Sequence, residues 1–151
     1  MPREGDFAEI DWGVLPPDHI PATMDELVDG WIVNNAATSA TPIDRPLDGD
    51  RPHFWAWEVA AHLAYQHPEQ AMAFIVAMLA RPIADDTRFS LAAGPLEDVL
   101  AYNGPAVIGD VERLARQDAR FRDTLQGVWR NAMSEEIWRR VRVARLDPDI
   151  E

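Results

Sequence analysis

The sequence has no cysteine, no lysine and no apolar run long enough to cross a bilayer. The missing cysteine excludes disulfide bonds, thiolate zinc sites and a cysteine nucleophile. The missing lysine excludes the lysine that a Walker-type loop uses to reach a phosphate. The most apolar run, residues 71–80, is about half of a membrane span, and residues 1–6 lack a basic region followed by an apolar stretch. We therefore expect a cytoplasmic protein without a membrane partner.

Acidic side chains are in strong excess. The 151 residues carry a formal net charge of −12, and all 14 basic residues are arginine. The charge is uneven, at −9 over residues 1–50 and +1 over residues 111–151. Such a surface repels nucleic acid over most of its extent, and it favours a protein partner with a basic surface near the amino-terminal half.

One short stretch of the chain occurs twice. Leu-Ala-Tyr-Gln-His-Pro at residues 63–68 returns as Leu-Ala-Tyr-Asn-Gly-Pro at residues 100–105, which is 37 positions later. Each copy closes an apolar helical segment, and its proline opens the next one. This pattern is typical of stacked helical hairpins. The repeated stretch does not recur at the following turn near Ser134, so the predicted helical repeat is degenerate.

The predicted fold is all-α. We expect an irregular stack of antiparallel helical hairpins, either a superhelix similar to HEAT or tetratricopeptide solenoids or a compact helical bundle. A single helical domain is predicted over residues 23–151, with hairpins at about 53–80, 89–117 and 119–145. Within the hairpins we predict helices over 53–66, 68–80, 89–103, 105–117, 119–132 and 134–145. The capping-box pattern of Thr23 and Glu26 predicts one earlier helix, which ends near residue 34.

Two segments are predicted to be non-helical. Four prolines within residues 1–22 predict an extended, acidic, proline-rich arm. Trp12 in this arm either clamps it against the domain or faces a partner. The turn formers of residues 36–52 predict a long polar loop, and its Asp44, Asp48 and Asp50 are candidate contacts for a basic partner.

Signals for chemistry are weak. Glu58 and His62 stand one helical turn apart and are a weak candidate pair for a metal, but no third ligand is evident. There is no Gly-x-Ser-x-Gly elbow and no Walker-type loop. We therefore predict no cofactor, no metal site and no catalytic residues.

The stretch Ala-Ala-Gly-Pro-Leu-Glu-Asp at residues 92–98, followed by Asn103-Gly104 and Val128-Trp129, resembles a family of small bacterial helical proteins, the domain of unknown function 6869. The resemblance covers about residues 53–145 and implies an independent helical domain without an established activity. In physical terms, Gly94-Pro95 fits a helix start with Glu97 and Asp98 in its first turn. The same two carboxylates are alternatively contacts for a basic partner.

Together these features favour a non-catalytic protein–protein interaction module for a basic partner, of the immunity or neutralising type by analogy. Two alternatives stay open. One is an enzyme of unrecognised type that uses carboxylates or histidines. The other is nucleic-acid binding through the arginines of residues 113–145, although acids are interleaved with them. A homodimer also stays open.

Overall fold

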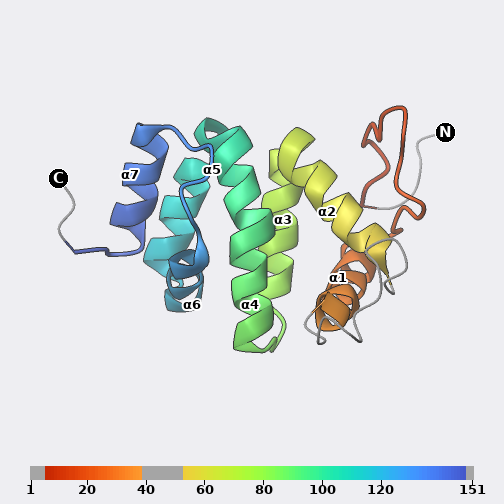
Figure 1. Cartoon of the computed structure of the whole chain (residues 1–151), viewed down its shortest axis with the longest axis horizontal. Helices are drawn as coiled ribbons and strands as arrows, with labels where there is room; N and C mark the ends of the chain where they lie inside the picture. Colours follow the sequence, from red (N-terminus) through yellow and green to blue (C-terminus); the bar gives the residue numbers. More distant parts are fainter. Residues whose placement is uncertain (1–5, 39–52, 149–151) are drawn as a thin grey trace.

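The structure is a computed structural model that describes residues 6–38 and 53–148, and all the regular elements of these ranges are helical. The elements are α1 (Met24–Thr38), α2 (Phe54–Gln66), α3 (Pro68–Leu79), α4 (Asp85–Leu91), a π-helical turn (Ala92–Leu96), α5 (Glu97–Gln117), α6 (Ala119–Thr124), a 3-10 turn (Leu125–Gly127) and α7 (Glu135–Ala144). Figure 1 shows them packed side by side, with α1 and α2 at one end and α7 at the other. The prediction of an all-α fold is confirmed. No helix in the described ranges has the length and apolar character needed to span a membrane.

The core runs through the whole array, and α3 lies in its middle. This helix packs against α1, α2, α5 and the π-helical turn. Its Phe74, Ile75 and Met78 are fully buried, as is Leu63 of α2. Burial of such side chains contributes roughly 1.5–3 kcal/mol each to stability. The nearly all-apolar sequence of this helix is explained by neighbours on several sides.

Helix starts follow the caps that the sequence predicts. Thr23 Oγ1 accepts a hydrogen bond from the Glu26 N–H at 3.1 Å, and Ser134 Oγ accepts one from the Ile137 N–H at 3.2 Å. Pro68 occupies the first turn of α3, where no N–H is needed. These local signals explain why the starts of α1, α3 and α7 were predictable.

The amino-terminal segment, residues 6–23, contains no helix and folds back onto the domain. Phe7, Ile10 and Trp12 are buried. Asp6 fastens the start of the segment, since its Oδ2 accepts a hydrogen bond from the Met24 N–H at 2.6 Å. The segment therefore forms part of the core at the α1–α2 end of the molecule (Figure 1).

Two predicted helix ends are wrong. The first helix continues to Thr38 instead of ending near residue 34, because Ala36 and Ala37 are strong helix formers, and residues 36–38 of the predicted loop are therefore helical. The helix predicted over 119–132 ends at Thr124, and residues 128–134 are extended or in turns. A side chain holds this stretch, since Glu97 Oε1 accepts a hydrogen bond from the Trp129 N–H at 2.8 Å. The following α7 packs against α5.

The predicted helix start at Gly94-Pro95 is also wrong, because the chain passes through these residues in a π-helical turn. Proline has no N–H and its ring collides with the carbonyl four residues earlier in an α-helix. In the π-helical turn, a backbone N–H donates to the carbonyl five residues earlier, as the Glu97 N–H does to the Ala92 carbonyl. This shift skips the missing N–H of Pro95, so the helical path continues into α5.

The second copy of the repeated stretch produces a kink instead of a full turn. Asn103 leaves the helical conformation, with φ −139° and ψ 31°, in the middle of α5. Its Nδ2 donates hydrogen bonds to the Ala64 and Tyr65 carbonyls at 2.7 and 3.1 Å, and so satisfies the end of α2. The two tyrosines of the repeat, Tyr65 and Tyr102, meet edge to face with ring centroids 4.7 Å apart. The two copies therefore lie side by side.

A buried arginine that no sequence pattern indicates joins α4 to α6. Arg88 is almost fully buried, and its guanidinium reaches Asp123 at 2.7 Å, Thr124 Oγ1 at 3.1 Å and Asp85 at 3.1 Å. A buried guanidinium is tolerated when its N–H groups are paired in this way. The cluster fixes α6 against the helix that precedes the π-helical turn.

We expect Asn103→Ala to lower the free energy of unfolding by about 1–3 kcal/mol, because the buried Ala64 carbonyl loses its donor. Urea unfolding followed by circular dichroism measures the change. The matched control is Gln117→Ala at the exposed end of α5, for which we expect less than about 0.5 kcal/mol. Equal stability of Asn103→Ala and the native protein would contradict the role given to this amide.

Candidate functional site

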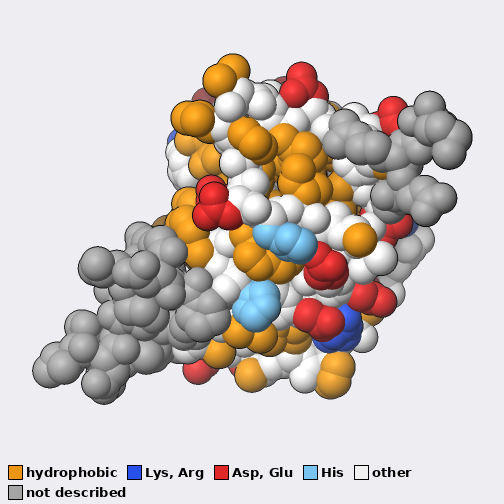
Figure 2. All heavy atoms as spheres, turned by 90° about the vertical axis from the view of Figure 1, so that its right-hand side faces the viewer, with side chains coloured by type: hydrophobic (Ala, Val, Ile, Leu, Met, Phe, Trp, Pro, Cys, Tyr) orange, Lys and Arg blue, Asp and Glu red, His pale blue; other side chains and the backbone are white. Residues whose placement is uncertain are grey.

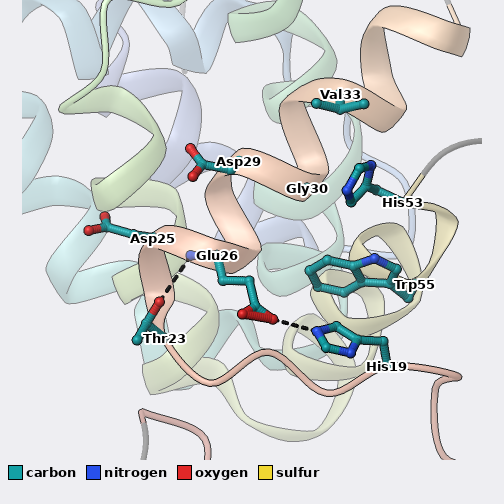
Figure 3. Close-up of a pocket in the computed structure, with 9 residues that line it drawn as sticks. All are labelled: His19, Thr23, Asp25, Glu26, Asp29, Gly30, Val33, His53 and Trp55. Carbon is teal, nitrogen blue, oxygen red and sulfur yellow. Dashed lines mark hydrogen bonds and ion pairs between the residues drawn. The ribbon is translucent and has the colours of Figure 1, made fainter.

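A groove lies between the amino-terminal segment, α1 and the start of α2, with a volume of about 590 Å³. We call it the acidic groove. Its lining is shown in Figure 3 and consists of His19, Thr23, Asp25, Glu26, Asp29, Gly30, Val33, His53 and Trp55. Three of these residues are carboxylates on consecutive turns of α1, and two are histidines from outside that helix.

Trp55 forms one wall of the acidic groove because α1 and α2 touch at Gly30. A Cβ atom at Gly30 would lie 2.8 Å from Trp55 Cζ2 and 3.1 Å from Ala56 Cβ, closer than side chains tolerate. The ring centroids of His19 and His53 lie 4.6 and 6.0 Å from that of Trp55. The indole is thus held between the α1 backbone and two imidazoles, as Figure 3 shows.

The electrostatics of the groove are strongly negative. Residues 6–38 contain seven aspartates and glutamates and neither lysine nor arginine. Glu26 points toward His19 and pairs with its Nε2. Asp25 and Asp29 form the rim, with side chains 86% and 65% exposed. Arg81 bridges both rim carboxylates, at 3.3 and 2.7 Å.

This end of the molecule presents acidic side chains, imidazoles and exposed apolar atoms on one face, as Figure 2 shows. Among the described residues, Arg81 supplies positive charge at the rim, and the three carboxylates leave this part of the groove with a net negative charge. An aromatic wall beside carboxylates is the arrangement that receives a guanidinium or ammonium group, through cation–π contact and charge-assisted hydrogen bonds.

The candidate metal pair lies elsewhere, on α2. His62 donates a hydrogen bond from Nε2 to the Asp11 carbonyl at 2.9 Å, and its ring centroid is 5.0 Å from that of Trp12. Burial, and then the charge of Asp18, raises the pKa of Glu58. Within residues 6–38 and 53–148, no three or more His, Asp or Glu side chains converge in a way that could hold a metal.

The other residues predicted as contacts lie in different surroundings. Trp12 is only 7% exposed and packs on Phe7 and His62, which fits the clamp interpretation and leaves little of it for a partner. Glu97 is occupied within the chain, because its Oε2 also accepts a hydrogen bond from Asn131 Nδ2 at 3.1 Å. The predicted contacts Asp44, Asp48 and Asp50 lie outside the described residues.

Asp98 lies beside Glu97 in a partly buried position. Burial, followed by the charge of Glu97, raises the pKa of Asp98 to about 6. Burial, and then the charge of Asp98, raises the pKa of Tyr65. The carboxylate therefore costs stability when ionised, and it is not a freely solvated contact.

Sequence reasoning placed the acidic contacts in the 36–52 loop and at Glu97 and Asp98, and it did not single out the carboxylates of α1. A local signal existed, since Asp25 and Asp29 stand four residues apart on one helix face, next to a glycine in the helix interior. No local sequence pattern indicates that His19, His53 and Trp55 line the same groove. This arrangement depends on how α2 packs against α1.

Comparison with known proteins identifies the family. Residues 44–148 match the model of a family described as "Family of unknown function (DUF6869)", so the chain belongs to this family. No curated protein and no solved structure matches the chain. His53 and Trp55 fall within the matched range, whereas His19 and the groove carboxylates of α1 precede it.

We expect Asp98→Asn to stabilise the protein by about 1 kcal/mol at about pH 7.5, a magnitude that allows for solvent screening of a partly exposed carboxylate. The pKa of Asp98 is higher in the folded than in the unfolded chain, so the native protein gains relative stability as the pH falls through about 6. The advantage of Asp98→Asn should therefore vanish below about pH 4.

Urea unfolding across this pH range measures the difference between Asp98→Asn and the native protein. The matched control is Glu9→Gln, which removes an exposed carboxylate from the amino-terminal segment. A stability difference for Asp98→Asn that does not change between neutral and acidic pH would contradict the raised pKa.

Proposed function

We propose that this protein is a non-catalytic protein–protein interaction module that receives a basic segment of a partner in the acidic groove. The observation that carries the proposal is the combination of the Trp55 wall, the inner carboxylate of Glu26 and an exposed acidic rim in one groove of about 590 Å³. Immunity and neutralising proteins are the class of binder that we favour, by analogy with other small acidic helical proteins.

The chain itself provides an example of the recognition proposed. Arg81 holds two rim carboxylates with one guanidinium, with Nη1 on Asp29 and Nη2 on Asp25. A partner arginine that enters the groove can stack on Trp55 and donate to Glu26, since guanidinium groups combine stacking with hydrogen bonding to carboxylates. The negative field of residues 6–38 also speeds the approach of a basic partner.

The arginines near the carboxyl terminus support a protein partner over nucleic acid. Arg140 forms a two-point contact with Glu112, and Arg145 and Arg142 both reach Asp147. Arg122 Nη1 donates to the Ala115 carbonyl at 2.8 Å. These guanidinium groups stabilise the carboxyl-terminal helices and are less available to phosphates than exposed arginines would be.

The double variant Asp25→Arg/Asp29→Arg is expected to weaken partner binding by about a hundredfold, because two attractive charges at the rim become repulsive. Affinity capture from a nuclease-treated lysate of the source cells, with mass spectrometry, compares it with the native protein. The matched control is Glu135→Arg/Glu136→Arg on α7, which changes the net charge equally at the far end of the molecule.

We expect to find a protein that the native chain and the α7 control both capture and that the α1 variant does not. Glu26→Gln provides a second check with almost no change of shape, and we expect about tenfold weaker binding. If both double variants lose the captured protein equally, or if neither variant loses it, the groove is not the binding site.

A further inference from the structure

His19 occupies the place in the acidic groove that a partner cation would take. Its ring centroid lies 4.6 Å from that of Trp55, and its Nε2 pairs with Glu26 (Figure 3). These are the aromatic wall and the inner carboxylate that the proposed function assigns to a partner guanidinium. Both members of the pair are open to solvent, since the side chain of His19 is 52% exposed and that of Glu26 is 37% exposed. A cationic side chain that enters the groove must therefore displace the His19 imidazole.

The strength of this internal contact depends on the charge of the imidazole. A neutral ring can donate one ordinary hydrogen bond to Glu26, whereas an imidazolium forms a charge-assisted pair that is roughly twice as strong. The imidazolium also gains cation–π attraction from Trp55. Histidine is the side chain that ordinarily changes its charge between pH 5 and 8. Displacement of His19 is therefore harder in acidic than in alkaline solution.

Carboxylates predominate among the charged groups of the described elements around His19. These groups are Asp18, Asp25, Glu26, Asp29, Glu58 and Arg81. Arg81 engages the two aspartates of the rim, whereas Glu26 engages His19 itself. Burial, and then the charge of Asp18, raises the pKa of Glu58. The inner carboxylate of the groove is thus the one whose partner can gain or lose a proton.

His53 adds a second imidazole to the groove. Its ring centroid is 6.0 Å from that of Trp55. With the three carboxylates of the lining and Arg81 counted, the described part of the groove has a formal charge of −2 when both imidazoles are neutral and 0 when both are protonated. The electrostatic attraction for a basic segment therefore falls over the same pH range.

We propose that His19 is an internal competitor that makes the acidic groove pH-dependent, so that the groove binds its basic partner in neutral to alkaline solution and releases it when the groove histidines are protonated. This inference rests on the proposed function and adds the regulation of the same site. In alkaline solution a partner guanidinium takes Glu26 and Trp55 from a neutral imidazole. In acidic solution the imidazolium keeps both contacts, and His53 adds repulsion.

The test measures the affinity of the full chain for a six-arginine peptide at pH 5.5 and pH 8, by isothermal titration calorimetry at low salt. Arginine keeps its charge over this range, so a change in affinity arises in the protein. We expect the native protein to bind at least about tenfold more weakly at pH 5.5 than at pH 8.

Two substitutions at His19 separate its charge from its shape. His19→Gln removes the titrating charge and should bind the peptide at least about threefold more tightly than the native protein at pH 5.5. His19→Arg carries a permanent charge at the same position. This variant should bind at least about tenfold more weakly than the native protein at pH 8.

The matched control is His67→Gln, which removes a histidine between α2 and α3, outside the lining of the groove. This variant should keep the native pH dependence. Asp98→Asn should keep it as well, because Asp98, with a pKa of about 6, also lies outside that lining.

The inference is overturned if the native protein binds the peptide equally at both pH values, or if His19→Gln keeps the full native pH dependence. It is also overturned if His19→Arg binds like the native protein at pH 8, or if His67→Gln loses the pH dependence. The peptide still binds in these cases, so the proposed function stands. If the peptide binds neither the native protein nor His19→Gln at pH 8, the proposed function fails, and the inference fails with it.

Discussion

The acidic groove owes its shape to the contact of α1 with α2 at Gly30. A side chain at Gly30 would collide with the Trp55 ring, so glycine allows the helix backbones to approach at this point. Gly30 and Trp55 then line the acidic groove.

Side chains bind main-chain groups at the end of α2 and in the stretch that follows α6. Asn103 satisfies the end of α2, and Glu97 binds the backbone N–H of Trp129. Pro95 is accommodated by a π-helical turn. At each of these places, the irregular stretch of backbone lies next to a packed neighbouring element. The result is a row of helices whose order follows the sequence closely, with its amino-terminal segment folded onto the first pair (Figure 1).

The helical class, the family and the caps at Thr23, Pro68 and Ser134 could be predicted from the sequence, because periodicity, turn residues and caps act over a few residues. The acidic groove could not be predicted, because His19, Glu26 and Trp55 come from three segments that only tertiary packing brings together. The role of Glu97 was missed for the same reason, because its partners are 32 and 34 residues away. The sequence leaves open whether Trp12 clamps the amino-terminal segment or faces a partner, because its burial against His62 depends on tertiary packing.

We propose that the acidic groove beside Trp55 receives a basic segment of a partner. The most direct measurement is a titration of the full chain with a six-arginine peptide, followed by the indole N–H resonances of its six tryptophans. If a basic segment binds in the acidic groove, the Trp55 resonance shifts saturably and the binding weakens with salt. The resonances of Trp129 and Trp138, in the carboxyl-terminal part of the chain, stay unchanged. A shift confined to Trp129, or no shift of Trp55 at low salt, would contradict the claim.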